Sequence, residues 1–196
     1  GPDPFTGMFT WNVEMLMWID DELGLEVVGM AQGVGQSGHV LTGDWGEMQA
    51  FAAREGFPQH HLVLRPEHQD DPRLHKGLSD PAELRRAFET CRDMAANGQV
   101  FAETDLRAFA NPSRMQRIGQ AAADLVQRLQ TCCPACNAPG FSVSARVPGL
   151  PCAACARPTT SHHSEVWSCP RCRHQVTLPR TDRRLADPAQ CNHCNP

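Results

Sequence analysis

The sequence lacks both a long apolar run and a leader-like start. No window of the 196 residues approaches the roughly eighteen apolar residues that a membrane-spanning helix needs. The first residues show no succession of charged, apolar and small residues typical of a secretory signal. We therefore expect a cytoplasmic protein with no membrane partner.

Recognisable catalytic signatures are lacking too. No Ser/His/Asp or Cys/His spacing identifies a hydrolase. Lys76 is the only lysine among 18 basic residues, which suggests a catalytic amine, although an arginine-biased composition leaves few lysines anywhere. Residues 33–38 have the Gly-x-Gly-x-x-Gly spacing, but residues 39–42 look extended. Because a phosphate-binding loop must lead into a helix, this segment predicts a connector.

The sequence is rich in paired cysteines. Nine of its ten cysteines fall in the last third, and two residues separate the members of each pair. Such a gap lets two thiolates converge on one tetrahedral ion, so each pair is half of a four-sulfur site. We predict two structural Zn²⁺ ions, with disulfides or iron as lesser alternatives. The predicted ligands are Cys133, Cys136, Cys152, Cys155, Cys169, Cys172, Cys191 and Cys194.

Two ways of joining the four pairs remain open. Neighbouring pairs would give a first zinc ribbon in residues 131–160 and a second in residues 161–196. Interleaved pairing, as in cross-braced modules, is also geometrically possible. We favour the sequential pairing because each half then contains a knuckle, a hairpin-length insert and a second knuckle. Cys132, which adjoins the first pair, is predicted to be a bystander.

The net charge of -4 conceals a split along the chain. Residues 1–130 hold 11 Lys and Arg against 19 Asp and Glu, giving -8, whereas residues 131–196 hold 7 against 3, giving +4. A basic zinc module suggests nucleic acid as a partner. However, four thiolates around one divalent ion carry about -2, so two filled sites would make the module roughly neutral. A protein partner for the ribbons is therefore favoured over nucleic acid.

The first 130 residues alternate strand and helix patterns. This alternation predicts an α/β protein, with a small mixed-sheet domain in residues 1–130 followed by the two zinc ribbons. Residues 67–77 are polar and indicate irregular structure. The expected elements are a hairpin over residues 13–32, strands over 61–64 and 99–103, and helices over 45–54, 81–95 and from 112 onward.

The densest cluster of functional groups lies between the strand at 99–103 and the last helix. Glu103 and Asp105 could hold a divalent cation such as Mg²⁺, and Arg107 and Arg114 could bind a phosphate or carboxylate near the helix start. Ordinary loop chemistry is the competing interpretation. The catalytic candidates are Glu103, Asp105, Arg107 and Arg114, and the ligand-binding candidates are Asn111, His60 and Lys76.

Several stretches together resemble a known family. They include Gly1–Pro4, Trp11–Glu14, Gly56–His60, Phe101–Ala108 and the cysteine-rich region. Across essentially the whole chain, the sequence is similar to a bacterial family called domain of unknown function 6671, which contains zinc ribbons. The resemblance implies an α/β domain that continues upstream of Gly1 and is therefore incomplete in this chain. It implies no activity.

Two functions compete on this basis. In the first, the α/β domain binds or hydrolyses a small anionic, nucleotide-like ligand. In the second, the protein is non-enzymatic, and the zinc ribbons form a protein- or nucleic-acid-binding module on an α/β scaffold. The sequence leaves open which of these is correct.

Overall fold

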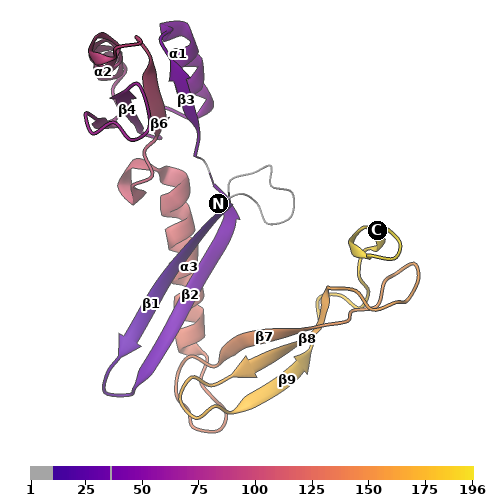
Figure 1. Ribbon diagram of the computed structural model, residues 1–196. Helices are drawn as coiled ribbons and strands as arrows, with labels where there is room; N and C mark the ends of the chain where they lie inside the picture. Colours follow the sequence, from indigo (N-terminus) through magenta and orange to yellow (C-terminus); the bar gives the residue numbers. More distant parts are fainter. Residues whose placement is uncertain (1–10, 36) are drawn as a thin grey trace. The chain divides into compact units, whose positions relative to one another are not determined.

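The computed structural model describes residues 11–35 and 37–196 and has the predicted mixed α/β class, with small sheets and three α-helices (Figure 1). The chain divides into two compact units. Unit 1 comprises Gly1–Met15 and Met30–Ala121, and unit 2 comprises Leu16–Gly29 and Ala122–Pro196. Among the described residues, no helix has the length and apolar content required to cross a bilayer.

The chain begins with a two-stranded sheet of β1 (Trp11–Asp20) and β2 (Leu25–Val34). In the turn, the backbone N–H of Leu23 donates to Asp20 Oδ1 at 2.8 Å. Gly24 then takes a φ of 61°, a left-handed conformation that glycine adopts without steric cost. These strands match the predicted hairpin and extend it by two residues at each end.

Unit 1 contains a four-stranded sheet in the order β3-β6-β4-β5, and its strands pair antiparallel. The strands are β3 (His39–Thr42), β4 (Leu62–Pro66), β5 (His75–Leu78) and β6 (Val100–Thr104). Strand β5 corrects the expectation that residues 67–77 are irregular. Only Leu78 of this strand is buried and its pairing with β4 is irregular, so no alternating pattern marks it in the sequence.

Helices α1 (Trp45–Arg54) and α2 (Pro81–Met94) pack on this sheet. Asp44 and Asp80 cap them, each accepting at 2.9 Å from the backbone N–H three residues later. Cys91 is fully buried here, and burial raises the pKa of its thiol to about 11. The shared core contains Met48, Phe51, Leu62, Leu64, Leu84, Phe88, Val100 and Ala102.

A loop leads from β6 through the short 3₁₀ helix η1 (Ala108–Ala110) into α3 (Pro112–Gln130). Asn111 caps α3, because its Oδ1 accepts from the backbone N–H of Arg114 at 3.0 Å. The side chain of Asn111 is buried, so this cap belongs to the interior of unit 1.

Unit 2 contains the antiparallel sheet β7-β8-β9, with strands β7 (Ser142–Pro148), β8 (His162–Ser168) and β9 (Gln175–Pro179). A short 3₁₀ helix, η2 (Pro188–Gln190), precedes the last cysteine pair. The hydrophobic cluster of this unit is small and includes cysteines. Its buried members are Leu25, Cys133, Ala138, Phe141 and Cys169.

Candidate metal centres

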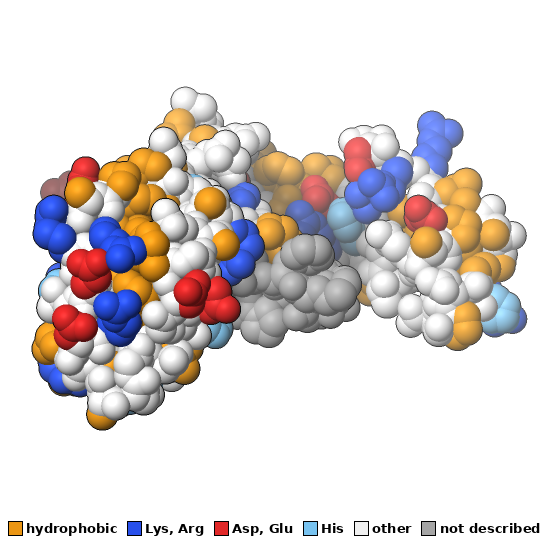
Figure 2. Space-filling model, turned by 90° about the horizontal axis from the view of Figure 1, so that it is seen from above, with side chains coloured by type: hydrophobic (Ala, Val, Ile, Leu, Met, Phe, Trp, Pro, Cys, Tyr) orange, Lys and Arg blue, Asp and Glu red, His pale blue; other side chains and the backbone are white. Residues whose placement is uncertain are grey.

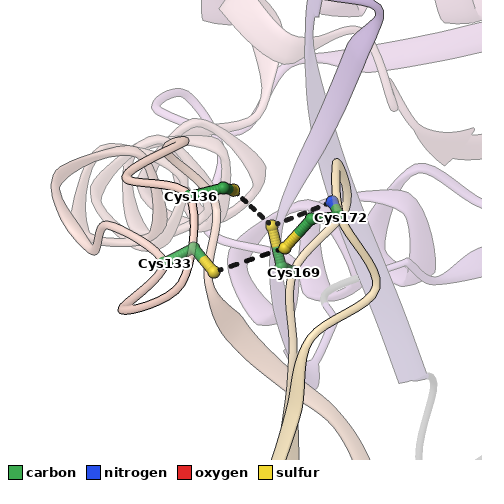
Figure 3. A group of neighbouring side chains, drawn as sticks. All are labelled: Cys133, Cys136, Cys169 and Cys172. Carbon is green, nitrogen blue, oxygen red and sulfur yellow. Dashed lines mark hydrogen bonds between the residues drawn. The ribbon is translucent and has the colours of Figure 1, made fainter.

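The eight paired cysteines gather into two sets of four. The first set comprises Cys133, Cys136, Cys169 and Cys172 (Figure 3), and the second comprises Cys152, Cys155, Cys191 and Cys194. Within each set, all four Sγ atoms lie within 4.8 Å of one another. Across residues 11–35 and 37–196, no other group brings together three or more His, Cys, Asp or Glu side chains suited to a metal. Both sets could hold a metal ion.

The sulfur separations fit a tetrahedral ion. In the first set, the Sγ atoms of Cys133 and Cys172 lie 3.7 Å apart. In the second set, those of Cys155 and Cys191 are also 3.7 Å apart. A tetrahedral zinc with bonds of about 2.3 Å separates its sulfurs by about 3.8 Å, whereas a disulfide bond is about 2.05 Å long. The distances therefore match shared coordination and not disulfide bonds.

The predicted sequential pairing is wrong, because the sets interleave. The first and third pairs form one set, and the second and fourth form the other. The antiparallel sheet explains this: the first pair precedes β7 and the third lies between β8 and β9, at the same end. The inserts between Cys136 and Cys152 and between Cys172 and Cys191, which we interpreted as hairpins, each contribute a single strand instead. A chain that reverses after every strand returns every second knuckle to the same end of the sheet.

The four knuckles share one backbone geometry. In each, the residue after the second cysteine donates its N–H to the carbonyl of the first cysteine, at 2.8 to 3.2 Å. In three of them an N–H two residues after the first cysteine also donates to its sulfur at 3.4 Å. The residues after the second cysteine are Asn137, Ala156, Arg173 and Asn195. The Cys-x-x-Cys spacing therefore specifies a turn that aims two sulfurs at one point.

The cysteine pKa values show what a metal would change. Burial raises the pKa of Cys169, but N–H donors from Cys172 and Arg171 outweigh it and bring the pKa to about 7. Backbone N–H donors from Cys194 and His193 likewise lower that of Cys191 to about 7. In contrast, the hydrogen bond with Cys155 is the main cause that raises the pKa of Cys194 to about 12. Full ionisation of each set therefore requires a cation between the sulfurs.

The two sets have different surroundings. The first is packed into the hydrophobic cluster with Leu25 and Phe141. The second is held by backbone pairing, since Ala186 donates to the carbonyl of Pro151 at 2.8 Å and accepts from Ala153 at 3.0 Å. Cys132 is exposed and belongs to neither set, as predicted. None of the nearby histidines replaces a cysteine in either set.

The predicted anion site is organised around separate ion pairs. Glu103 pairs with Arg65 across the sheet. The carboxylate of Asp105 accepts from the backbone N–H groups of Gly77 at 3.1 Å and of Arg107 at 3.0 Å, and from Arg107 Nε at 2.9 Å. Burial raises the pKa of Asp105, but these hydrogen bonds and the charge of Arg107 outweigh it and leave the pKa below its ordinary value. Glu103 and Asp105 therefore bind different arginines.

The other candidates also have defined places. Arg114 Nε binds Glu14 at 2.7 Å, while Asn111 caps α3. His60 Nε2 lies 2.9 Å from Ser113 Oγ, and Lys76 is exposed on β5. The roles of these residues in ligand binding stay predictions. Sequence reasoning missed the residues that bind these candidates and Glu103, namely Glu14, Arg65 and Ser113. No local pattern predicts contacts between segments that are far apart in the sequence.

The fold and these sets define a class: a mixed α/β protein with two interleaved four-cysteine centres. Residues 1–196 match the family described as Domain of unknown function (DUF6671), and the chain belongs to that family. No curated protein and no solved structure gives a significant match.

Double substitutions test the interleaved pairing directly. We expect Cys152→Ser with Cys191→Ser to damage one set and leave one bound ion per chain. Cys133→Ser with Cys152→Ser should damage both sets and leave none. Metal analysis of the purified variants measures this, with Cys132→Ser as the control that keeps both ions. Sequential pairing requires the opposite result for the two doubles.

Ala156 offers a test of the knuckle geometry. Its φ of 59° is left-handed and costs an alanine about 1 kcal/mol, a cost that glycine avoids. Because glycine also loses more entropy on folding, we expect Ala156→Gly to stabilise unit 2 by about 0.5 kcal/mol. Ala154→Gly, in the same knuckle, should destabilise it by about 0.5–1 kcal/mol. Chelator titration of both variants gives the comparison, and equal effects would contradict the argument.

The buried carboxylate of Asp105 predicts a pH dependence. Because its folded pKa lies below 3.8, the stability that it contributes is present above that value and is lost as pH falls through the folded pKa. Asp105→Asn should therefore lower the unfolding free energy by about 1.5–3 kcal/mol at pH 7, with the difference from wild type shrinking below about pH 4. Urea unfolding of both proteins at each pH measures it. A constant difference would contradict this account.

Proposed function

We propose that this chain is a zinc-binding protein whose two ions are structural and whose role is recognition of a macromolecule without catalysis. One observation carries the proposal: two sets of four cysteine sulfurs, with spacings close to those of a tetrahedral ion. Thiolate ligands select zinc or iron among common metals, and four-cysteine tetrahedral sites in small modules are typically structural zinc.

The arrangement supports a structural role for the metal. Four thiolates close the coordination shell, which leaves no position for a water or substrate. Unit 2 buries few large apolar side chains, and a small core of this kind rarely folds without additional cross-links. An ion at one end of the sheet would join the knuckle before β7 to the knuckle after β8. An ion at the other end would join the knuckle after β7 to the knuckle after β9. Eight reduced thiols also suit a reducing compartment such as the cytoplasm.

The contacts in unit 1 favour recognition over the small-anion hypothesis. Arg107 and Arg114, which we expected to bind one small anion together, bind two different carboxylates, Asp105 and Glu14. The two carboxylates expected to share Mg²⁺ pair with separate arginines. Ordinary loop and capping chemistry accounts for all of these contacts. A nucleotide-induced thermal shift that Glu103→Ala or Arg114→Ala removes would reverse this preference.

The charge distribution favours a protein partner over nucleic acid. On the face seen in Figure 2, basic and acidic side chains are interspersed with hydrophobic ones. A nucleic-acid-binding face usually concentrates Lys and Arg. Filled metal sites would also cancel most of the +4 charge of residues 131–196.

Metal content and chelation test the proposal. We expect two zinc ions per chain. A strong chelator should unfold the cysteine-rich sheet while helices α1 and α2 remain, because their core contains no metal ligand. Elemental analysis gives the stoichiometry, and circular dichroism with tryptophan fluorescence follows unfolding, with Cys132→Ser as the matched control. One ion or none, or loss of all helical signal with the metal, would overturn the assignment.

A further inference from the structure

The loop from Asp105 to Asn111 buries its polar ends and exposes its apolar side chains. Asp105 and Asn111 are 3% and 2% exposed, whereas Leu106 is 50% and Phe109 68% exposed. Phe109 is the most exposed large hydrophobic residue in the part of the chain that the structure describes. Isolated exposed leucines are ordinary, but an exposed aromatic beside one, on a loop with buried polar ends, indicates an interaction surface.

Backbone bonds hold this loop, so its apolar side chains are not needed to fix its shape. The N–H of Asp105 donates to the carbonyl of His61, and the N–H of His61 donates to that of Ala110, both at 2.9 Å. At the far end, Asn111 caps α3. Leu106 and Phe109 are therefore displayed from a constrained backbone, which lowers the entropy that binding must overcome.

A hollow adjoins the loop. It is a space of about 290 Å³ lined by Trp11, Asn12, Val13, Glu14, Leu106 and Arg114. This is smaller than most cofactor pockets and is large enough for one or two side chains. Trp11, Val13 and Leu106 give it an apolar wall, and the rest of its lining is polar. We call Trp11, Val13, Leu106, Arg107, Phe109 and Arg114 the Phe109 surface.

The charges at the Phe109 surface are cationic on the outside. In the pair of Arg107 with Asp105, the arginine side chain is 39% exposed and the carboxylate side chain 3%. In the pair of Arg114 with Glu14, the values are 37% and 15%. The guanidinium of Arg107 also lies 4.7 Å from the centre of the Phe109 ring. An approaching molecule thus meets arginine and apolar carbon, with Asp105 buried behind them and Glu14 in the lining of the hollow.

We propose that the Phe109 surface binds a protein segment whose apolar side chains are flanked by carboxylates. The hollow would take an apolar side chain, and the arginines complement the acidic flanks. The -8 charge of residues 1–130 opposes a phosphate backbone, which extends beyond any one surface. A short acidic segment responds mainly to charges within a Debye length of about 8 Å. This inference rests on the recognition role proposed above.

Peptide selection on the zinc-loaded chain of residues 1–196 tests it. Short random peptides displayed on phage should enrich for carboxylates next to Leu, Phe or Trp. The consensus peptide, labelled and measured by fluorescence anisotropy, should bind about tenfold or more weakly to Phe109→Ala and to Leu106→Ala. Lys76 lies on β5, next to the residue that binds Asp105, so Lys76→Glu should also weaken binding. Added salt should weaken binding as well. Met94→Ala and Leu74→Ala, both 42% exposed in the wild type, are matched controls and should leave the affinity unchanged.

The outcomes separate this inference from the proposed function. Enrichment of basic peptides, or equal affinity in Phe109→Ala, would overturn the inference. So would a labelled single-stranded oligonucleotide that binds through Phe109 while no peptide does. If binding survives Phe109→Ala but is lost in the Cys152→Ser, Cys191→Ser double variant, recognition stands and this surface fails. If neither peptide nor oligonucleotide binds, both proposals fail.

Discussion

Convergence of four sulfurs at each end of one antiparallel sheet is the constraint on which the C-terminal unit depends. Each knuckle presents two sulfurs, and neither half-site satisfies a tetrahedral ion alone. Strand β8 links the two sets, since it follows the knuckle of Cys152 and Cys155 and leads into that of Cys169 and Cys172. Interleaving therefore makes the two sites and the sheet one cooperative structure. Sequential ribbons would have folded independently.

The same constraint bears on the charge of residues 131–196. Without a metal, the hydrogen bond with Cys155 raises the pKa of Cys194 to about 12, whereas backbone N–H donors lower the pKa of Cys191 to about 7. A divalent ion would permit all four thiolates and leave about -2 at each site. With both ions bound, the +4 excess of residues 131–196 would roughly balance the two centres. A count of arginines alone would misjudge the surface that a partner encounters.

Local patterns predicted much of this structure. The starts of the helices at residues 45 and 81, the hairpin and the cysteine knuckles are encoded within a few residues, and each was predicted. Long-range pairing was not found in this way. The insert between Cys136 and Cys152 is long enough for a hairpin or for one strand, and only the antiparallel register decides between them. Strand β5 has one buried residue, and Arg65 reaches Glu103 only because β4 and β6 are neighbours.

The loop after β6 shows why a cluster of charged residues is weak evidence for catalysis. Asp105 and Arg107 are two residues apart, yet they bind each other, and Asp105 also accepts from the backbone N–H of Gly77. Their pairing fixes the loop and turns the apolar side chains of Leu106 and Phe109 outward. Removing one member of such an ion pair destabilises the fold. The pair therefore affects function indirectly, through the loop conformation that it maintains. The sequence shows the charged residues, but the apolar residues between them form the surface.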